Sequence, residues 1–205
     1  MKVIILGGFL GSGKTTVLMQ LARYLVAGAK GSEMPVVILE NEISENGVDN
    51  QLLSRNNFTV ENMFSGCICC TSAGQLGDTI GVIEYSYHPE WLIIEATGMA
   101  YPDSILETIR HDIGLDAAIL AIVDATRWRR TLIAMKQFIT SQLNGANVVL
   151  VTKIDTVSKE TVEEVVAGVR EYAPESEIRP ICALTPLGDE FWAETVGLLE
   201  REEGK

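Results

Sequence analysis

The chain has 205 residues, enough for one well-buried core, and its 47% apolar and 21% charged residues are typical of a globular domain. No apolar run is long enough to span a bilayer, which argues against a membrane protein. The formal net charge of −12 argues against general binding to nucleic acid or to anionic membranes, because such binding needs clustered Lys and Arg. We expect one domain over residues 1–205. Residues 1–6 are strand-like and leave no room for a secretory signal, so the expected location is cytoplasmic.

A glycine-rich loop, GGFLGSGKTT at residues 7–16, follows the apolar run 3–6 and precedes a helix-like segment at 17–29. It contains G-x-x-x-x-G-K-[ST], and its order of strand, loop and helix lets backbone N–H groups and a positive helix end converge on phosphate oxygens. Lys14 is expected to neutralise the β- and γ-phosphates, and Thr15 to ligate Mg²⁺. The alternative is a glycine turn that only reverses the chain. The predicted nucleotide-binding residues of this loop are Gly8, Gly11, Ser12, Gly13, Lys14, Thr15 and Thr16.

The rest of the chain alternates between apolar runs and amphipathic segments. Further strands are predicted at 36–40, 58–63, 91–95, 115–125, 147–155 and 177–184. Further helices are predicted at 102–111, 129–143, 161–173 and 189–200, with a weaker helix at 71–87 because Gly77 and Gly81 lower its propensity. Strands separated by helical segments give right-handed crossovers. The predicted fold class is therefore α/β: a P-loop NTPase with a mostly parallel central sheet and helices on both faces.

Acidic residues follow two of these strands on the side of the sheet where the phosphate loop lies. The polar segment NEISENGVD, residues 41–49, carries Glu42, Glu45 and Asp49. Glu95 ends the strand WLIIE, at the position where phosphate-loop enzymes keep a second carboxylate for Mg²⁺. We predict Thr15, Glu42 and Glu95 as magnesium ligands, with Glu42 or Glu95 positioning the attacking water.

Gly98 lies three residues after Glu95 and would let its backbone approach the γ-phosphate. The loop that contains it would then differ between the triphosphate and diphosphate states, as a switch does. The alternative is an exposed turn glycine without a functional role. We predict Gly98 as a nucleotide-binding residue.

The segment GCICC places Cys67, Cys69 and Cys70 within four residues. This crowding suits a thiolate site for Zn²⁺, Ni²⁺, Co²⁺ or Cu⁺ better than a disulfide framework. Three sulfurs leave one tetrahedral position for Glu42, Glu45, a water, a His, a second protomer or a client, and an open position is what a carrier needs. The alternative is three reduced, partly buried thiols.

The strand end VTKID predicts recognition of a guanine base. A carboxylate at Asp155 would accept hydrogen bonds from N1–H and the 2-amino group, which adenine cannot offer. Lys153 would lay its stem over the base plane. Ala183, after the last predicted strand, would supply a backbone N–H to the base oxygen, and Cys182 is read as a buried apolar residue. The alternative is a strand end with a capping Asp.

The set GFLGSGKTT, NEISENGVD, GCICC, IIEATGMAYP, IVDA and TKID resembles, in order and spacing, the CobW-like metallochaperone GTPases. These are relatives of the hydrogenase and urease nickel-insertion GTPases, and the match covers residues 3–185. The resemblance implies that Gly13, Lys14 and Thr15 cradle GTP and Mg²⁺ and that the GCICC cysteines bind the metal. It also implies a first switch containing Glu42 and Asp49, and a second containing Glu95 and Gly98.

The sequence departs from the family's usual pattern at three positions. Ser44 stands where Gly is usual, Tyr101 where Asp is common, and Thr152 where Asn is usual. CobW-like members often carry a second C-terminal domain and a His-rich stretch. We expect a lone GTPase module, so partner selection would come from its own surface or from a separate protein.

These features predict a slowly hydrolysing GTPase that couples GTP and Mg²⁺ to transition-metal binding and delivery to a client metalloprotein. A nucleotide-dependent homodimer is one option for its assembly. Two alternatives stay open: a nucleotide-regulated metal sensor or buffer without turnover, and a phosphotransferase with a small acceptor.

Overall fold

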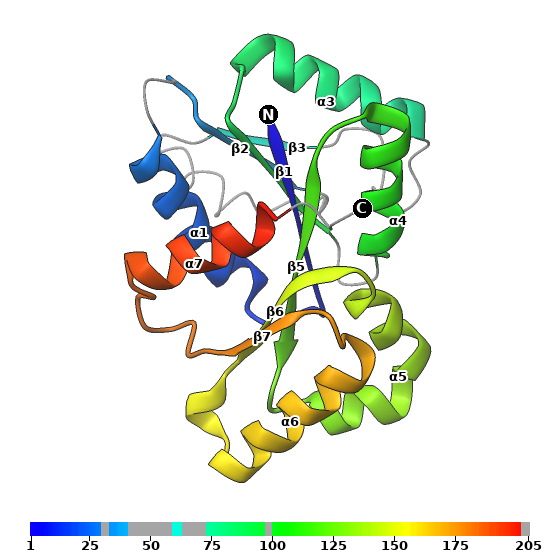
Figure 1. Ribbon diagram of the computed structural model, residues 1–205, viewed down its shortest axis with the longest axis vertical. Coiled ribbons are helices and arrows are strands. Elements are labelled where there is room, and N and C mark those ends of the chain that lie inside the picture. Colours follow the sequence, from blue (N-terminus) through cyan, green and yellow to red (C-terminus); the bar gives the residue numbers. More distant parts are fainter. Residues whose placement is uncertain (30–32, 41–58, 63–72, 97–99, 202–205) are drawn as a thin grey trace.

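The computed structural model describes residues 1–29, 33–40, 59–62, 73–96 and 100–201. The segments 41–49 and 67–70, in which the sequence predicts a switch and a metal site, lie outside these residues. Figure 1 shows a central sheet that runs through the molecule, with helices packed against it.

The sheet contains seven strands among the described residues, in the order β3-β2-β4-β1-β5-β6-β7. Every neighbouring pair is parallel. The strands are β1 (Lys2–Gly8), β2 (Val36–Glu40), β3 (Thr59–Asn62), β4 (Trp91–Glu95), β5 (Ala117–Asp124), β6 (Ala146–Thr152) and β7 (Glu177–Pro180). The first strand is central, so the loop that follows it emerges between β4 and β5.

Helices cover both faces of this sheet. They are α1 (Lys14–Gly28), α3 (Ala73–Tyr87), α4 (Pro102–Glu107), α5 (Trp128–Leu143), α6 (Lys159–Tyr172) and α7 (Asp189–Leu199). Apolar residues of α1 and α7 belong to one buried cluster, and those of α3, α4, α5 and α6 to another. The predicted α/β fold with a parallel sheet between two helical layers is confirmed.

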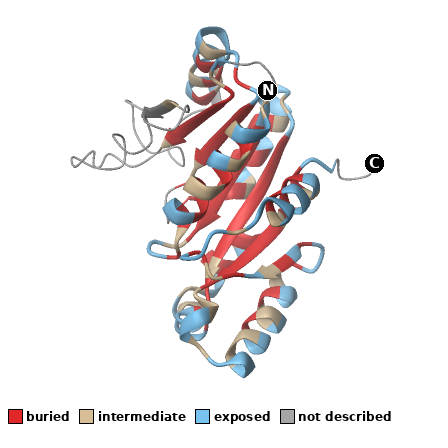
Figure 2. Ribbon diagram, turned by 90° about the vertical axis from the view of Figure 1, so that its left-hand side faces the viewer, coloured by how far each residue is buried: buried red, intermediate tan, exposed pale blue. Residues whose placement is uncertain are grey.

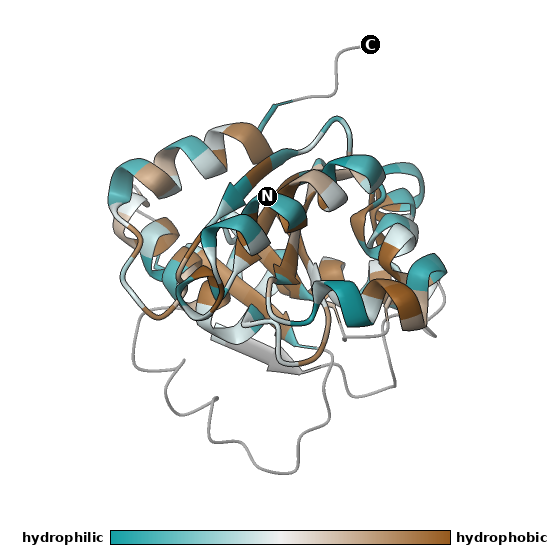
Figure 3. Ribbon diagram, turned by 90° about the horizontal axis from the view of Figure 1, so that it is seen from below, coloured by the Kyte–Doolittle hydropathy of each residue, from teal (hydrophilic) through white to brown (hydrophobic). Residues whose placement is uncertain are grey.

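The central strands are buried on both faces, as continuous apolar runs predict. Along β1, Ile4 and Leu6 pack with α1 and α7, whereas Val3 and Ile5 pack with the helices of the opposite face. Figure 2 shows the strands as the buried layer of the molecule. Figure 3 shows the same strands as hydrophobic and much of the outer helical surface as hydrophilic. Burial on both sides therefore holds the strand that positions the phosphate loop within the core.

Three elements differ from the sequence-based expectation. The weak helix at 71–87 is a regular helix over Ala73–Tyr87, because burial of Leu76, Ile80 and Ile83 offsets the low propensity of its glycines. The helix predicted to end near residue 111 continues from α4 into a π-helix, η2 (Thr108–Ile113), which stops at a left-handed Gly114. The last strand, predicted over 177–184, ends at Pro180, although the Ile181 N–H that follows still donates to the Val151 oxygen of β6 at 2.8 Å.

Helix α5 contains a kink. Met135 has φ −143° and ψ 43°, which is not helical, although the helix continues on both sides. No proline or glycine lies within α5, so the sequence does not predict this kink.

Candidate nucleotide-binding site

The phosphate loop connects β1 to α1 and depends on glycine at three positions. Gly8, Gly11 and Gly13 have φ of 138°, 74° and 96°, a region that other residues rarely adopt. A Cβ atom at Gly8 would lie 2.6 Å from the backbone oxygen of Ile122 in β5. The loop therefore needs glycine both for its backbone conformation and for its close approach to the neighbouring strand.

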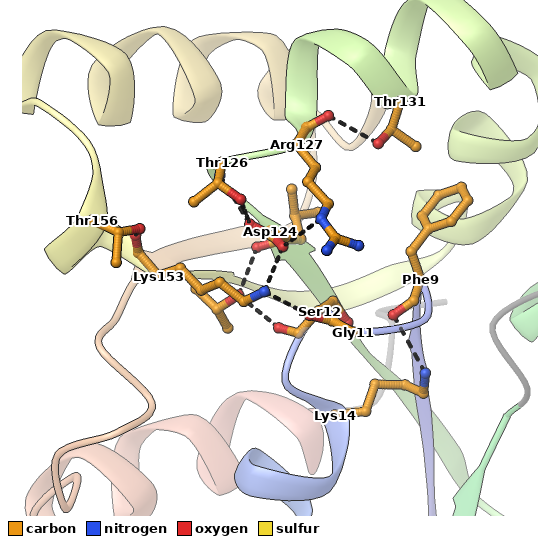
Figure 4. Close-up of polar contacts among 12 residues, drawn as sticks. Phe9, Gly11, Ser12, Lys14, Asp124, Thr126, Arg127, Thr131, Lys153 and Thr156 are labelled. Carbon is orange, nitrogen blue, oxygen red and sulfur yellow. Dashed lines mark hydrogen bonds and ion pairs between the residues drawn. The ribbon is translucent and has the colours of Figure 1, made fainter.

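Lys14 is the first residue of α1, and its side chain folds back over the beginning of the loop (Figure 4). Its Nζ donates to the Gly8 oxygen at 3.1 Å and to the Phe9 oxygen at 3.5 Å. The residue is only 8% exposed. A largely buried ammonium group at the start of a helix is suited to an anion such as phosphate. Thr15 and Thr16 are exposed on the first helical turn, so their hydroxyls are accessible from solvent.

The Ser12 hydroxyl is a buried polar group at the tip of the loop. Its residue is 1% exposed, and its Oγ has no hydrogen-bond partner in the part of the chain that the structure describes. An unpaired buried hydroxyl is unfavourable, and an oxygen of a bound phosphate would accept its hydrogen. The donors of this loop therefore fit a phosphate group.

Two side chains from the end of β6 hold the tip of the loop (Figure 4). The Thr152 hydroxyl donates to the Ser12 oxygen at 2.7 Å, with the Val123 oxygen at 3.1 Å as a second acceptor. Lys153 Nζ donates to the Gly11 oxygen at 2.7 Å. Thr152 thus contacts the loop through its hydroxyl, at the position where the resemblance leads us to expect an Asn amide.

Asp124, the last residue of β5, forms an ion pair with Lys153. Its carboxylate is 2.7 Å from Lys153 Nζ and 3.7 Å from Arg127 Nε, and it accepts hydrogen bonds from the N–H and hydroxyl of Thr126. Burial by itself would raise the pKa of this carboxyl, but the hydrogen bonds from Lys153 and Thr126 hold the pKa below its ordinary value. Asp124 is therefore ionised and keeps the Lys153 ammonium over the loop.

The predicted base-reading residues follow the carboxyl ends of the neighbouring strands β6 and β7. Lys153 has a left-handed backbone, φ 60°, which is unusual for a residue with a side chain and is typical of a functional turn. Asp155 is exposed in the short helix η3 (Ile154–Thr156) that follows. Ala183 is buried, and its oxygen accepts a 2.8 Å hydrogen bond from Gln20 in α1. Cys182, expected to be buried, is partly exposed.

A hollow lies between α1 and the segment after β7. Its volume is about 610 Å³, and Thr15, Thr16, Gln20 and Ala183 contribute to its lining. Gln20 also accepts a 2.8 Å hydrogen bond from the N–H of Leu187, so it fixes this segment to α1 at two points. Two residues predicted to bind the phosphates, Thr15 and Thr16, thus line the same hollow as Ala183, which is predicted to bind the base.

Glu95 lies beside the phosphate loop at the end of β4. The sheet register pairs it with Leu6 of β1 on one side and with Glu40 of β2 on the other. The following residue, Ala96, donates its N–H to the Leu6 oxygen at 3.0 Å. Glu42, Gly98, Cys67, Cys69 and Cys70 lie outside the described residues. Within those residues, no three His, Cys, Asp or Glu side chains gather as a metal site.

Comparison with protein families identifies the chain. The model of the CobW/HypB/UreG nucleotide-binding domain matches residues 2–180. The chain belongs to the CobW/HypB/UreG family. This confirms the family expected from the motifs, and the phosphate loop, the β6 strand end and Glu95 all lie within the matched residues.

Curated members of this family include proteins described as zinc chaperones. The chain is 32% identical to zinc chaperone YjiA of Escherichia coli over 84% of its own length and 55% of YjiA. It is 27% identical to zinc-regulated GTPase metalloprotein activator 1 of Dictyostelium discoideum, over 91% of its own length and 47% of that protein. The chain therefore spans about half the length of these relatives.

Solved structures of family members share the fold. The hydrogenase maturation factor HypB of Archaeoglobus fulgidus superposes with a TM-score of 0.67 at 16% identity, covering 96% of this chain and 89% of HypB. Zn(II)-bound YjiA of E. coli superposes with a TM-score of 0.57 at 26% identity, covering 83% of this chain and 54% of YjiA. None of the described helices has the length and apolar character that crossing a bilayer requires.

Sequence reasoning missed two residues that organise this family member's site. Asp124 has a sequence signal, since it is a carboxylate directly after a buried strand beside the phosphate loop. Gln20 has none, because a glutamine in an amphipathic helix is typical of a solvated surface.

Proposed function

We propose that this chain is a GTP-dependent metallochaperone that binds a transition metal, foremost Zn²⁺, through Cys67, Cys69 and Cys70. In this proposal it hydrolyses GTP slowly and delivers the metal to a client metalloprotein. The observation that carries the proposal is its similarity to a zinc chaperone over 84% of the chain. The three cysteines lie in the sequence between the phosphate loop and Glu95, which suits a metal site controlled by nucleotide.

The phosphate groups would be held by the loop from Gly8 to Thr16. Lys14, already bonded to the loop's own oxygens, would exchange these acceptors for the β- and γ-phosphates. Thr15 and Glu95, with Glu42, would hold Mg²⁺. When bound with GTP, this ion supplies positive charge that stabilises the negative charge developing on the phosphate oxygens. Glu42 or Glu95 would orient the attacking water.

Guanine would be recognised at the ends of β6 and β7. The exposed Asp155 carboxylate would serve as the double acceptor that selects guanine over adenine. Lys153 would cover the base with its stem while its ammonium stays on Gly11 and Asp124. Ala183 would contribute its backbone N–H.

Coupling between the two ligands would pass through residues 41–49 and 95–101, next to the γ-phosphate. GTP would favour one arrangement of these segments and GDP the other, so the affinity for metal would differ between the two states. A client protein, a separate partner or a nucleotide-dependent homodimer would supply the remaining metal ligand.

The deciding experiment measures Zn²⁺ affinity by competition with a chromophoric chelator, with and without a non-hydrolysable GTP analogue. The same titrations with Ni²⁺ and Co²⁺ identify the preferred metal. We expect the analogue to change Zn²⁺ affinity by roughly 5- to 150-fold, and Zn²⁺ to change analogue affinity by the same factor. Replacing Cys67, Cys69 and Cys70 together by Ser should lower Zn²⁺ affinity by about 100-fold or more, because thiolates are the preferred ligands.

Cys182→Ser is the matched control, because Cys182 is the remaining cysteine of the sequence and should leave Zn²⁺ affinity unchanged. Unchanged affinity in the triple variant would overturn the metal site. Phosphate release measured with Zn²⁺ separates the remaining alternatives. Coupled binding without turnover would indicate a sensor or buffer, and turnover only with an added small acceptor would indicate a phosphotransferase.

A further inference from the structure

Gln142 joins two backbone segments that are far apart in the sequence. It lies in the last turn of α5 and is 3% exposed. Its Oε1 accepts a hydrogen bond from the Gly8 N–H at 2.8 Å, and its Nε2 donates to the oxygen of Ala100. One amide therefore uses its acceptor on one segment and its donor on the other.

The first of these segments begins the phosphate loop, and the second leads from β4 into α4. Ala100 is fully buried and precedes the start of α4 at Pro102. The two segments also touch directly, since a Cβ atom at Gly7 would lie 2.8 Å from the Pro102 side chain. A displacement of the Ala100 backbone relative to Gly8 therefore has to strain or break a bond of the Gln142 amide.

Close packing holds the neighbours of Gln142 on α5, since Ile139 and Leu143 are buried in the core and the Phe138 ring contacts the rings of Phe9 and Tyr101. A cavity of about 350 Å³ lies between α5 and β5, and its lining includes Phe9, Leu10, Met135 and Gln142. The kink at Met135 is on the same wall. Gln142 borders this open space, and its amide makes the hydrogen bonds that connect this end of α5 to both Gly8 and Ala100.

We propose that Gln142 is a positioning residue that couples the phosphate loop to the segment entering α4, so that nucleotide binding at the loop is transmitted to that segment. The link extends the proposed function, because the same segment follows Glu95 and carries the predicted second switch. An amide offers one acceptor and two donors in a fixed plane, so it holds Gly8 and Ala100 together only in a narrow range of relative positions. When Lys14 exchanges the Gly8 oxygen for a phosphate oxygen, the resulting shift of Gly8 would therefore be transmitted to Ala100.

The test measures hydrogen exchange of the backbone amides of residues 100–107 with and without a saturating GTP analogue. We expect the analogue to change the exchange rates of these amides by about tenfold in the unaltered chain. Gln142→Met preserves side-chain length and removes both hydrogen bonds, so the change should fall below about twofold while the analogue still saturates the site. Gln142→Ala is the second variant if the methionine variant does not fold.

Asn144→Ala is the matched control. Asn144 Nδ2 donates to Asp103 Oδ2 at 3.1 Å, so it links the same end of α5 to α4 without touching the phosphate loop. Its variant should respond to the analogue as the unaltered chain does. If Asn144→Ala lost the exchange response to the same extent as Gln142→Met, the proposal would be overturned. That result would show that any contact between α5 and α4 is enough to transmit nucleotide binding.

Two further results would also overturn the proposal: a full response in Gln142→Met, or no response in the unaltered chain. Zn²⁺ affinity measured on the same samples separates this inference from the proposed function. If exchange responds to the analogue through Gln142 but Zn²⁺ affinity does not, the metallochaperone function fails and the link stands.

Discussion

The tip and the beginning of the phosphate loop are held in different ways. At the tip, Thr152 and Lys153 from the end of β6 bind the oxygens of Ser12 and Gly11, and Asp124 holds the lysine. At the beginning, the amide of Gln142 from a kinked helix binds the Gly8 N–H. Residues that follow or end strands therefore hold the base side of the loop, whereas residues of helices hold its beginning: Lys14 of α1, and Phe138 and Gln142 of α5 beside a cavity.

The largest effect is expected from Lys14→Met, which removes the ammonium group bonded to the Gly8 and Phe9 oxygens at the beginning of the loop. Since Lys14 supplies the charge for the β- and γ-phosphates, GTP affinity should fall by roughly 100-fold or more. Isothermal titration calorimetry with a GTP analogue measures this loss. Lys136→Met, the same change at an exposed lysine of α5 that does not line the hollow beside α1, is the control and should bind normally. Normal binding by Lys14→Met would contradict the assignment of the phosphate site.

Asp124→Asn tests the tip and should reduce the free energy of unfolding by about 1–3 kcal/mol at pH 7, because it removes the charge of a buried carboxylate that is paired with the partly exposed Lys153. The folded-state pKa of Asp124 is below its ordinary 3.8. Its stabilising effect is therefore fully present above that value and is lost as pH falls through the lower folded-state pKa. Urea unfolding of both proteins at pH 7 and near pH 3 measures the difference.

The difference between the Asp124→Asn variant and the unaltered protein should shrink at the lower pH. A difference that stays constant with pH would show that the Asp124 charge contributes nothing. Asp124 also accepts a hydrogen bond from the Thr126 hydroxyl. Thr126→Val removes only this bond, so it should lower the free energy of unfolding by less than Asp124→Asn does.

Thr152→Val should have the smallest effect, about 0.5–1.5 kcal/mol in the free energy of unfolding, because it removes one hydroxyl donor without changing side-chain size much. Ser12 would lose its anchor to β6 while Gly11 keeps Lys153. GTP affinity should fall by only a few fold. If Thr152→Val instead abolished GTP binding, the tip would depend on one contact rather than on several, and the comparison of the two ends of the loop would fail.

The fold and the position of the phosphate loop were predictable because burial and the loop's chemistry are local in sequence. The apolar runs 36–40 and 91–95 are strands with the predicted bounds. The glycine positions of the loop follow from backbone geometry that other residues rarely adopt.

Contacts between segments that are far apart in the sequence could not be predicted from the sequence. Gln142 and Gln20 are ordinary polar residues of helices, and nothing in their neighbours' identity indicates a partner more than a hundred residues away in the chain. The kink at Met135 likewise has no local signal, because α5 contains neither proline nor glycine.

The central position of β1 in the sheet also determines when the phosphate loop can form during folding. Lys2 pairs with Trp91 and Val3 pairs with Ala117, so the strand has no partner near it in sequence. Such non-local pairing gives a high contact order and slow folding. On the ribosome, the loop that would receive GTP stays without its two flanking strands until β5 has been synthesised, so nucleotide cannot assist folding before that stage.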